Sequence, residues 1–336
     1  MSDHIHYISL QSYQPSDKVN NILQLLLENS DQPYYELQQQ YKLHATRLFN
    51  KKHIIDGLYV LYHGAVQFTT HRQYNAGHEL AMIYCNKCFQ YIQIMNQQLF
   101  DDLLSIIYAD STDTATNLTI HQCNITYLKS VLKYVQSIHG KQSTNNNNES
   151  NNTNDQLNEY ISIIRLRMGY SYMKLNQYKS SNVQYILGMV NMDVYIQQHL
   201  ELIQLWCQQC NQSIENQYIV CRTILQYLAL NKLDCAISIF HCIQHHISYI
   251  DNQPLTHYIM FLLQLIQCNE LSTSNDLHIT TLEHKQKLYE SLCHRYQPLL
   301  SNDTQYQSYL NKIGELYFHM KSAQNSMIES IMSNFS

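Results

Sequence analysis

Glycine, proline and tryptophan are scarce in this sequence, and the scarcity of the first two narrows the fold. Of the 336 residues, 7 are glycine, 4 are proline and 1 is tryptophan. A collagen repeat needs glycine at every third position, and a turn-dense β-sandwich also needs many glycines, so both are excluded. Because glycine and proline are the two strongest helix breakers, a chain with so few of them is expected to be all-α.

Charge is also scarce, and its balance excludes several kinds of partner. Charged residues make up 14 % of the chain, against roughly 25 % in an average soluble domain. The 26 acidic and 21 basic residues give a formal charge of −5, so we expect no nucleic-acid partner. Apolar runs such as Tyr258–Leu263 are far shorter than the ~18 residues of a membrane span, so we expect no direct membrane insertion.

The first residues and the cysteines indicate the cytosol. Residues 1–18 contain no basic segment followed by an apolar run, which is the pattern of a secretory signal. Ten cysteines in a chain of this size, without such a signal, indicate reduced thiols and a cytosolic localisation.

Apolar residues recur at helical spacing along the whole sequence. One such stripe contains Val19, Ile22, Leu23 and Leu26, and comparable stripes follow, joined by short polar connectors. No segment alternates with period two for long enough to predict a strand. Repeated helical hairpins predict an α-solenoid of tetratricopeptide-like units in a single elongated domain.

Short polar segments suggest how this solenoid is organised. Residues 173–178 and 230–236 resemble the turns between paired helices. Residues 143–155 include the tract STNNNNESNNTN, which has no apolar side chain to offset its ordering entropy and is expected to be a disordered loop. We therefore expect an N-terminal solenoid half at 1–142 and a C-terminal half at 156–336.

Two C-x-x-C pairs are candidates for metal chemistry. They are Cys85/Cys88 and Cys207/Cys210. Each pair lies on one face of an expected helix, and four thiolates can bind zinc tetrahedrally. The pairs lie far apart in the sequence and lack the glycine-bearing turn of zinc ribbons, which favours buried structural cysteines.

Motifs for catalysis are missing from the sequence. His241 and His245 have the i, i+4 spacing of metal ligands, but no H-E-x-x-H is present, which favours a polar helix face. The sequence contains neither glycine-rich phosphate loop, G-x-x-x-x-G-K-[ST] or G-x-G-x-x-G, and no G-x-S-x-G. We therefore expect no enzymatic activity, no metal and no cofactor.

One stretch near the N-terminus is basic in an otherwise acidic chain. Residues 41–55 contain no acidic residue and carry the cations Lys42, Arg47, Lys51 and Lys52. On a helix, Arg47 and Lys51 share one face because they are four residues apart. Such a patch suits the docking of an acidic partner, and it is equally compatible with a solvated helix face.

Two apolar segments near the C-terminus are candidates for helix packing. Residues 254–266 are the most apolar stretch in the chain. They form either an inner solenoid helix, which we favour, or a groove that receives a partner helix. Residues 327–335 are amphipathic, and either cap the last hairpin or fray.

Short motifs in a fixed order resemble one family over nearly the whole chain. The early motifs are YYELQQQY at 34–41, RLF at 47–49 and LYHGAVQF at 61–68. The later motifs are VCRTILQYL at 220–228, LCHRYQPL at 292–299 and YLNKIGELY at 309–317. Together they resemble the Golgi-to-ER traffic protein 4 family, whose members are cytosolic α-solenoid adaptors in the targeting of tail-anchored membrane proteins.

This resemblance implies a bridging role without catalysis. In the family, the N-terminal half docks a dimeric targeting ATPase through charged residues. The C-terminal half holds a ubiquitin-like adaptor protein, which recruits a co-chaperone that carries the client. Such an adaptor raises the effective concentration of client at the ATPase. The resemblance leaves open whether a BAG-type chaperone subunit joins the complex.

The same resemblance implies two sets of docking residues. The residues implied for ATPase docking are Lys42, Arg47, Lys51, Lys52 and Glu79. The residues implied for docking of the ubiquitin-like partner are Ile247, Tyr249, Pro254, Leu255, Tyr258 and Phe261. The second set is apolar, as a groove that receives a helix requires.

Two other interpretations of the sequence stay open at this point. The first is a scaffold subunit of another helical-repeat assembly, similar to the proteasome lid. Co-purification with lid-like subunits and without a ubiquitin-like protein would support it. The second is a zinc-dependent enzyme built on the cysteine pairs, which predicts stoichiometric zinc in metal analysis.

Overall fold

α-Helices make up nearly all of the regular structure. The computed structural model describes residues 9–28, 33–107, 114–143, 150–189, 193–210, 213–247, 250, 252–270 and 278–320. Within these residues it contains 14 helices and no strand, which confirms the all-α prediction. None of the described helices combines the length and the apolar composition that a bilayer crossing requires.

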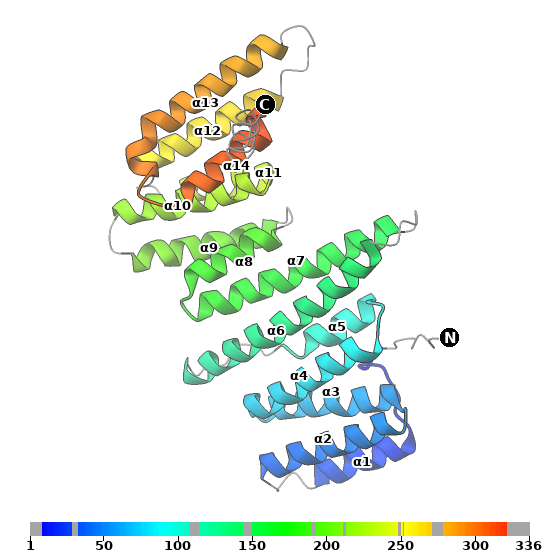
Figure 1. The fold of residues 1–336 in the computed structure, drawn as a ribbon. Coiled ribbons are helices and arrows are strands. Elements are labelled where there is room, and N and C mark those ends of the chain that lie inside the picture. The colour runs from blue at the N-terminus through cyan, green and yellow to red at the C-terminus, as the bar shows by residue number, and fades with distance from the viewer. Residues whose placement is uncertain are drawn as a thin grey trace, which may run out of the picture. The chain divides into compact units, whose positions relative to one another are not determined.

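The chain forms two compact units, Met1–Gly188 and Met189–Ser336, whose helices are labelled in Figure 1. The helices of unit 1 are α1 (Asp17–Glu28), α2 (Tyr34–Asn50), α3 (Ile54–Thr70), α4 (Tyr74–Tyr91), α5 (Gln97–Ser105), α6 (Thr114–Ser143), α7 (Ser150–Lys174) and α8 (Tyr178–Gly188). The helices of unit 2 are α9 (Asp193–Gln209), α10 (Ser213–Ala229), α11 (Leu233–His246), α12 (Pro254–Glu270), α13 (His278–Leu300) and α14 (Tyr306–Phe318).

The Asn-rich tract lies within unit 1, Met1–Gly188. Helix α7 begins at Ser150, inside the segment 143–155 that was expected to be a loop, while residues 144–149 lie outside the described part. Helices α6 and α7 pack against each other on either side of this segment. The tract therefore connects two packed helices of unit 1, and the division into units comes at Gly188.

Four hairpins are closed by one kind of turn that needs no glycine. In each turn a residue with positive φ follows the first helix, and these residues are Lys52, Arg72, Asn176 and Asn231. The next N–H donates to a carbonyl five residues back, at distances of 2.8–3.0 Å. This is the hydrogen bond that defines a Schellman C-cap. The turns at 175–177 and 230–232 lie where the sequence predicts inter-helix turns.

A close approach of α2, α3 and α4 leaves little room for a side chain at Gly64. Gly64 lies on α3, facing the ring of Tyr41 on α2 and the side chain of Leu80 on α4. A Cβ at Gly64 would lie 2.7 Å from Tyr41 Cδ1 and 2.8 Å from Leu80 Cδ1. All three residues belong to helices that share one continuous apolar core, so glycine here permits the tight packing.

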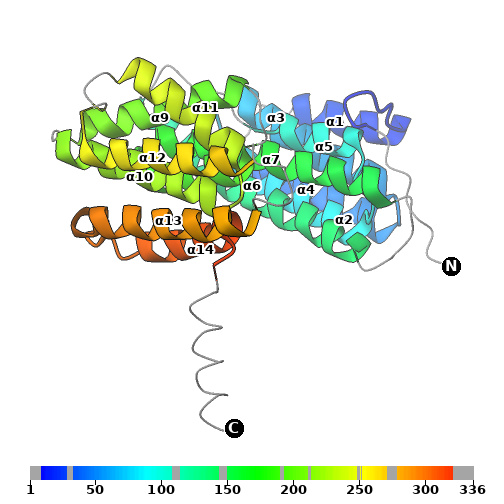
Figure 2. The ribbon, with the colours of Figure 1, turned by 90° about the horizontal axis from the view of Figure 1, so that it is seen from above.

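In unit 2, polar contacts fasten the last two helices to α10. Helices α13 and α14 lie side by side (Figure 2) and are joined by the turn at 301–305. Arg222 on α10 forms an ion pair with Asp303 in this turn, donating from Nε at 3.0 Å and also from Nη2. The Tyr306 hydroxyl donates to the Tyr218 carbonyl at 2.8 Å. These contacts set the position of the α13–α14 pair on α10.

Candidate docking sites

Lys42 and Glu79 form an ion pair between α2 and α4. Lys42 Nζ lies 2.5 Å from Glu79 Oε1, and Gln38 Nε2 donates to Glu79 Oε2 at 2.8 Å. Gln38 also donates to the Ala76 carbonyl at 3.1 Å, which fixes its amide. The hydrogen bond from Lys42 is the main reason that the pKa of Glu79 is lowered. We call Gln38, Lys42 and Glu79 the α2–α4 cluster.

The α2–α4 cluster presents its negative charge outward. The Lys42 side chain is 20 % exposed, whereas the Glu79 side chain is 56 % exposed. A partner that approaches this place therefore meets a carboxylate held in one orientation, with the ammonium group beneath it. The site is suited to receiving a cationic side chain, because the carboxylate keeps unused acceptor positions.

A second site lies near the C-terminal end of α2, and we call it the basic hollow. It has a volume of about 320 Å³. Its lining residues are Ser16, Lys18, Ile22, His44, Arg47, Leu48, Lys51, His53 and Asp56. They come from α1 with the residue before it, from α2, from the α2–α3 turn and from α3. Cations from separate segments thus converge on one concave surface.

The single carboxylate of the basic hollow is already engaged. Asp56 accepts a hydrogen bond from the Tyr13 hydroxyl at 2.9 Å, and its other oxygen lies 4.0 Å from His53 Nδ1. Burial, assisted by this contact, raises the pKa of Tyr13 to about 12. Within the described part of the chain, Arg47 and Lys51 form no ion pair, so their charges face solvent.

The structure therefore divides the residues implied for ATPase docking. Lys42 and Glu79 meet in the α2–α4 cluster, and Arg47 and Lys51 meet in the basic hollow. Lys42 and Arg47 are five positions apart, which is about 140° around a helix. Lys52 is exposed at the positive-φ position of the α2–α3 turn and does not line the hollow.

Sequence reasoning missed one cation of the basic hollow. Lys18 lies on α1 and precedes the basic stretch 41–55 by more than twenty residues. No local spacing links it to Arg47, because the fold alone brings α1 and α2 together. The only available signal is that Lys18 directly precedes the apolar stripe that begins at Val19.

The residues implied for docking of the ubiquitin-like partner differ sharply in exposure. Ile247, Leu255 and Tyr258 are buried in unit 2. Pro254 and Phe261 are exposed, and the Phe261 side chain is 45 % exposed. Tyr249 lies outside the described residues. Only two members of the described set, both on α12, are therefore exposed to solvent, and the other three are buried.

Three of the four cysteines in the two C-x-x-C pairs are buried, and Cys210 is half-buried. Cys85 and Cys88 are buried on α4, and burial raises the pKa of Cys85 to about 12 and that of Cys88 as well. Burial also raises the pKa of Cys207 to about 12. Zinc binds thiolates, which these environments disfavour. Across the described residues, no group of three or more His, Cys, Asp or Glu side chains is arranged to hold a metal.

Stacked helical hairpins define the class of this protein by its fold: an α-solenoid. The family model described as Golgi to ER traffic protein 4 matches residues 51–336. The chain belongs to this family. Membership supports a role in the GET pathway, in which tail-anchored proteins are targeted to the endoplasmic reticulum, and the family is of the helical adaptor type.

Individual relatives agree with this assignment over nearly the whole chain. The Golgi to ER traffic protein 4 homolog B of Xenopus laevis is 22 % identical over 323 residues, covering 94 % of this chain and 85 % of the relative. The Homo sapiens homolog is also 22 % identical over 323 residues, covering 94 % and 84 %. The crystal structure of C. therm. Get4 superposes with a TM-score of 0.64 at 16 % identity, covering 95 % of this chain and 96 % of that chain. This last likeness shows the α-solenoid fold.

Proposed function

We propose that this chain is a cytosolic adaptor that bridges a dimeric targeting ATPase to a ubiquitin-like protein and its client-loaded co-chaperone. Unit 1 docks the ATPase and unit 2 docks the ubiquitin-like protein. The adaptor contributes proximity and not chemistry, because a bridged client encounters the ATPase at an increased effective concentration.

The observation that carries the ATPase part of this proposal is the basic hollow. Lys18, Arg47 and Lys51 line a concave surface whose single carboxylate, Asp56, is held by Tyr13. The chain as a whole is acidic, so this concentration of positive charge is local. An acidic side chain of the ATPase would be steered to the hollow and would find several donors there.

The α2–α4 cluster gives the interface a second, opposite charge. Glu79 is exposed and held by Lys42 and Gln38, so it suits a lysine or arginine of the ATPase. Two sites of opposite sign fix the register of docking better than one, because a shifted partner would bring like charges together.

Charge reversal tests the ATPase site. The double variant Arg47→Glu/Lys51→Glu should weaken ATPase binding by about tenfold or more, because acidic partner groups would then face like charge. Binding that remains should depend less on salt than binding of the wild type. Titration calorimetry at two salt concentrations measures both effects.

A matched control keeps the change in net charge constant. Lys287→Glu/Arg295→Glu reverses two exposed cations on α13 of unit 2. This control should bind the ATPase like the wild type, and Arg47→Glu/Lys51→Glu should still bind the ubiquitin-like protein. If both double variants bind the ATPase equally well, the basic hollow is not the docking site.

The unit 2 part of the proposal depends on the exposed residues of α12. Phe261→Ala should weaken binding of the ubiquitin-like protein, because an exposed aromatic side chain is a typical anchor of an interface. Phe89→Ala is the matched control, since Phe89 on α4 of unit 1 is also 45 % exposed. Equal affinities of the two variants, measured by size-exclusion chromatography and calorimetry, would remove Phe261 from the interface.

A further inference from the structure

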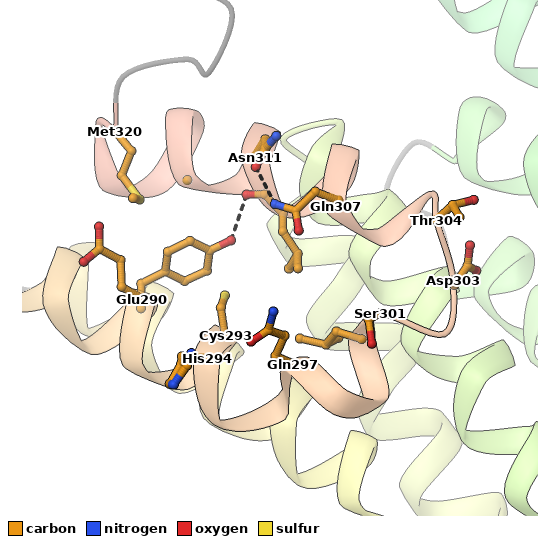
Figure 3. A pocket seen from close by; sticks show the side chains of 14 residues that line it. Glu290, Cys293, His294, Gln297, Ser301, Asp303, Thr304, Gln307, Asn311 and Met320 are labelled. Carbon is orange, nitrogen blue, oxygen red and sulfur yellow. Dashed lines mark hydrogen bonds between the residues drawn. The ribbon is translucent and has the colours of Figure 1, made fainter. Parts of the chain in front are cut away.

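A groove lies between α13 and α14. Its volume is about 570 Å³. Figure 3 shows side chains of both helices pointing into it, among them Cys293 and Gln297 from α13 and Gln307 from α14. The Tyr289 hydroxyl donates to the Leu310 carbonyl at 2.8 Å across its base. The groove is thus a built feature of the last hairpin, with an apolar base and polar walls.

The chain leaves α14 by a turn that brings it back to this groove. His319 has φ 51° and ψ 34°, a left-handed conformation that ends the helix. The next N–H, that of Met320, donates to the Gly314 carbonyl at 3.0 Å. Met320 lines the groove (Figure 3), and a Cβ at Gly314 would lie 3.1 Å from its sulfur atom. The last described residue is therefore already seated at one end of the groove.

The sequence that follows Met320 has the pattern of a segment that fits such a groove. Sixteen residues follow in this sequence, and Lys321 is the first of them. On a helix, five apolar side chains of this segment would share one face: Met327, Ile328, Ile331, Met332 and Phe335. The polar stretch 321–326 spans up to about 20 Å when extended, which is enough for the apolar segment to turn back along α13.

The short linker and the charges near the groove favour residues 327–335 over a separate molecule as the occupant of the groove. A segment joined by a short linker is present at an effective concentration of about millimolar, whereas a second copy or a partner must bind from dilute solution. Glu290 lines the groove (Figure 3), and a cation, Lys321, directly follows Met320 in the sequence. The groove lining contains no Lys or Arg side chain that would oppose such an approach.

We propose that residues 327–335 dock as an amphipathic helix in the groove between α13 and α14 of the same chain. The apolar face covers the base of the groove, and the serine and asparagine side chains of the segment face solvent. This intramolecular contact is independent of the adaptor function proposed above. It covers the apolar base of the groove, which would otherwise face water.

The groove contains a native reporter for this contact. Cys293 lines it and is partly exposed, whereas Cys268 is exposed on α12 and lies outside the groove lining. Alkylation of the folded full chain with iodoacetamide, followed by mass spectrometry, gives the rate at each thiol. Relative to Cys268, Cys293 should react about tenfold faster in Ile331→Asp/Met332→Asp than in the wild type, because the open form of the contact would be populated.

Two further variants make the result decisive. Ser333→Asp places a charge on the opposite face of the segment, so it should leave the rate at Cys293 unchanged. Gln307→Cys adds a more exposed thiol on the α14 wall, which should show the same protection and the same release. Equal rates at both groove thiols in the wild type and in Ile331→Asp/Met332→Asp would overturn the proposal. Protection that increases with protein concentration would also overturn it, in favour of a second copy in the groove.

Discussion

His199 makes the stability of unit 2 depend on pH in a way that can be worked out from its surroundings. The side chain lies on α9 with no solvent exposure, and its Nδ1 is 2.8 Å from the hydroxyl of Tyr227 on α10. Burial lowers the pKa of His199 to about 3, from an ordinary value of 6.5. The informative substitution is His199→Gln, which cannot titrate and still offers Tyr227 a hydrogen-bond partner.

The direction of the effect follows from which state binds the proton first. Because the folded-state pKa is lowered, the unfolded chain becomes protonated at His199 as the pH falls through 6.5, while the folded chain stays neutral until about 3. The contribution of His199 to stability is therefore complete above pH 6.5 and is lost progressively below it. Between pH 7 and pH 5 the loss is about 2 kcal/mol.

The assay needs a signal that reports on unit 2. The single tryptophan, Trp206, lies on α9 seven residues after His199, so its fluorescence follows the unfolding of this unit. Urea titrations at pH 7 and pH 5 should show a fall in the unfolding free energy that is about 2 kcal/mol larger for the wild type than for His199→Gln. Equal falls would refute the reasoning, because all other titrating groups are common to both proteins.

Two further predictions concern packing and polar contacts. Gly64→Ala should destabilise unit 1 by about 1–3 kcal/mol, because the new methyl group would overlap the side chains of Tyr41 and Leu80; far-UV circular dichroism during thermal unfolding measures the loss, and an unchanged melting temperature would contradict it. Arg222→Lys should destabilise unit 2 by about 1 kcal/mol, because an ammonium group cannot reproduce the two guanidinium hydrogen bonds to Asp303. The tryptophan signal measures this second change, and full stability in the lysine variant would show that one donor is sufficient.

The helices and several turns could be predicted from the sequence because the determining signals are local. Helical spacing of apolar residues and the scarcity of helix breakers act within one element. The turns predicted at 173–178 and 230–236 lie between α7 and α8 and between α10 and α11. The scarcity of glycine was no obstacle to these turns, since asparagine adopts positive φ in both.

The candidate sites were harder to predict because they depend on which helix faces touch. Lys42 and Arg47 are close in sequence, yet one pairs with Glu79 on α4 and the other lines the basic hollow with Lys18. On α12, sequence spacing cannot separate buried Leu255 from exposed Phe261, because both belong to one apolar run and only packing within unit 2 separates them.

The Schellman turns also bear on how far this fold tolerates sequence change. Each turn is held by hydrogen bonds between backbone groups, and lysine, arginine and asparagine all occupy the left-handed position. The strain of about 1 kcal/mol that such a residue introduces is offset by the turn as a whole and places no strict demand on side-chain identity. Because these turns depend on backbone hydrogen bonds, the fold can be kept while most side chains change. This accords with a shared fold at 16 % identity.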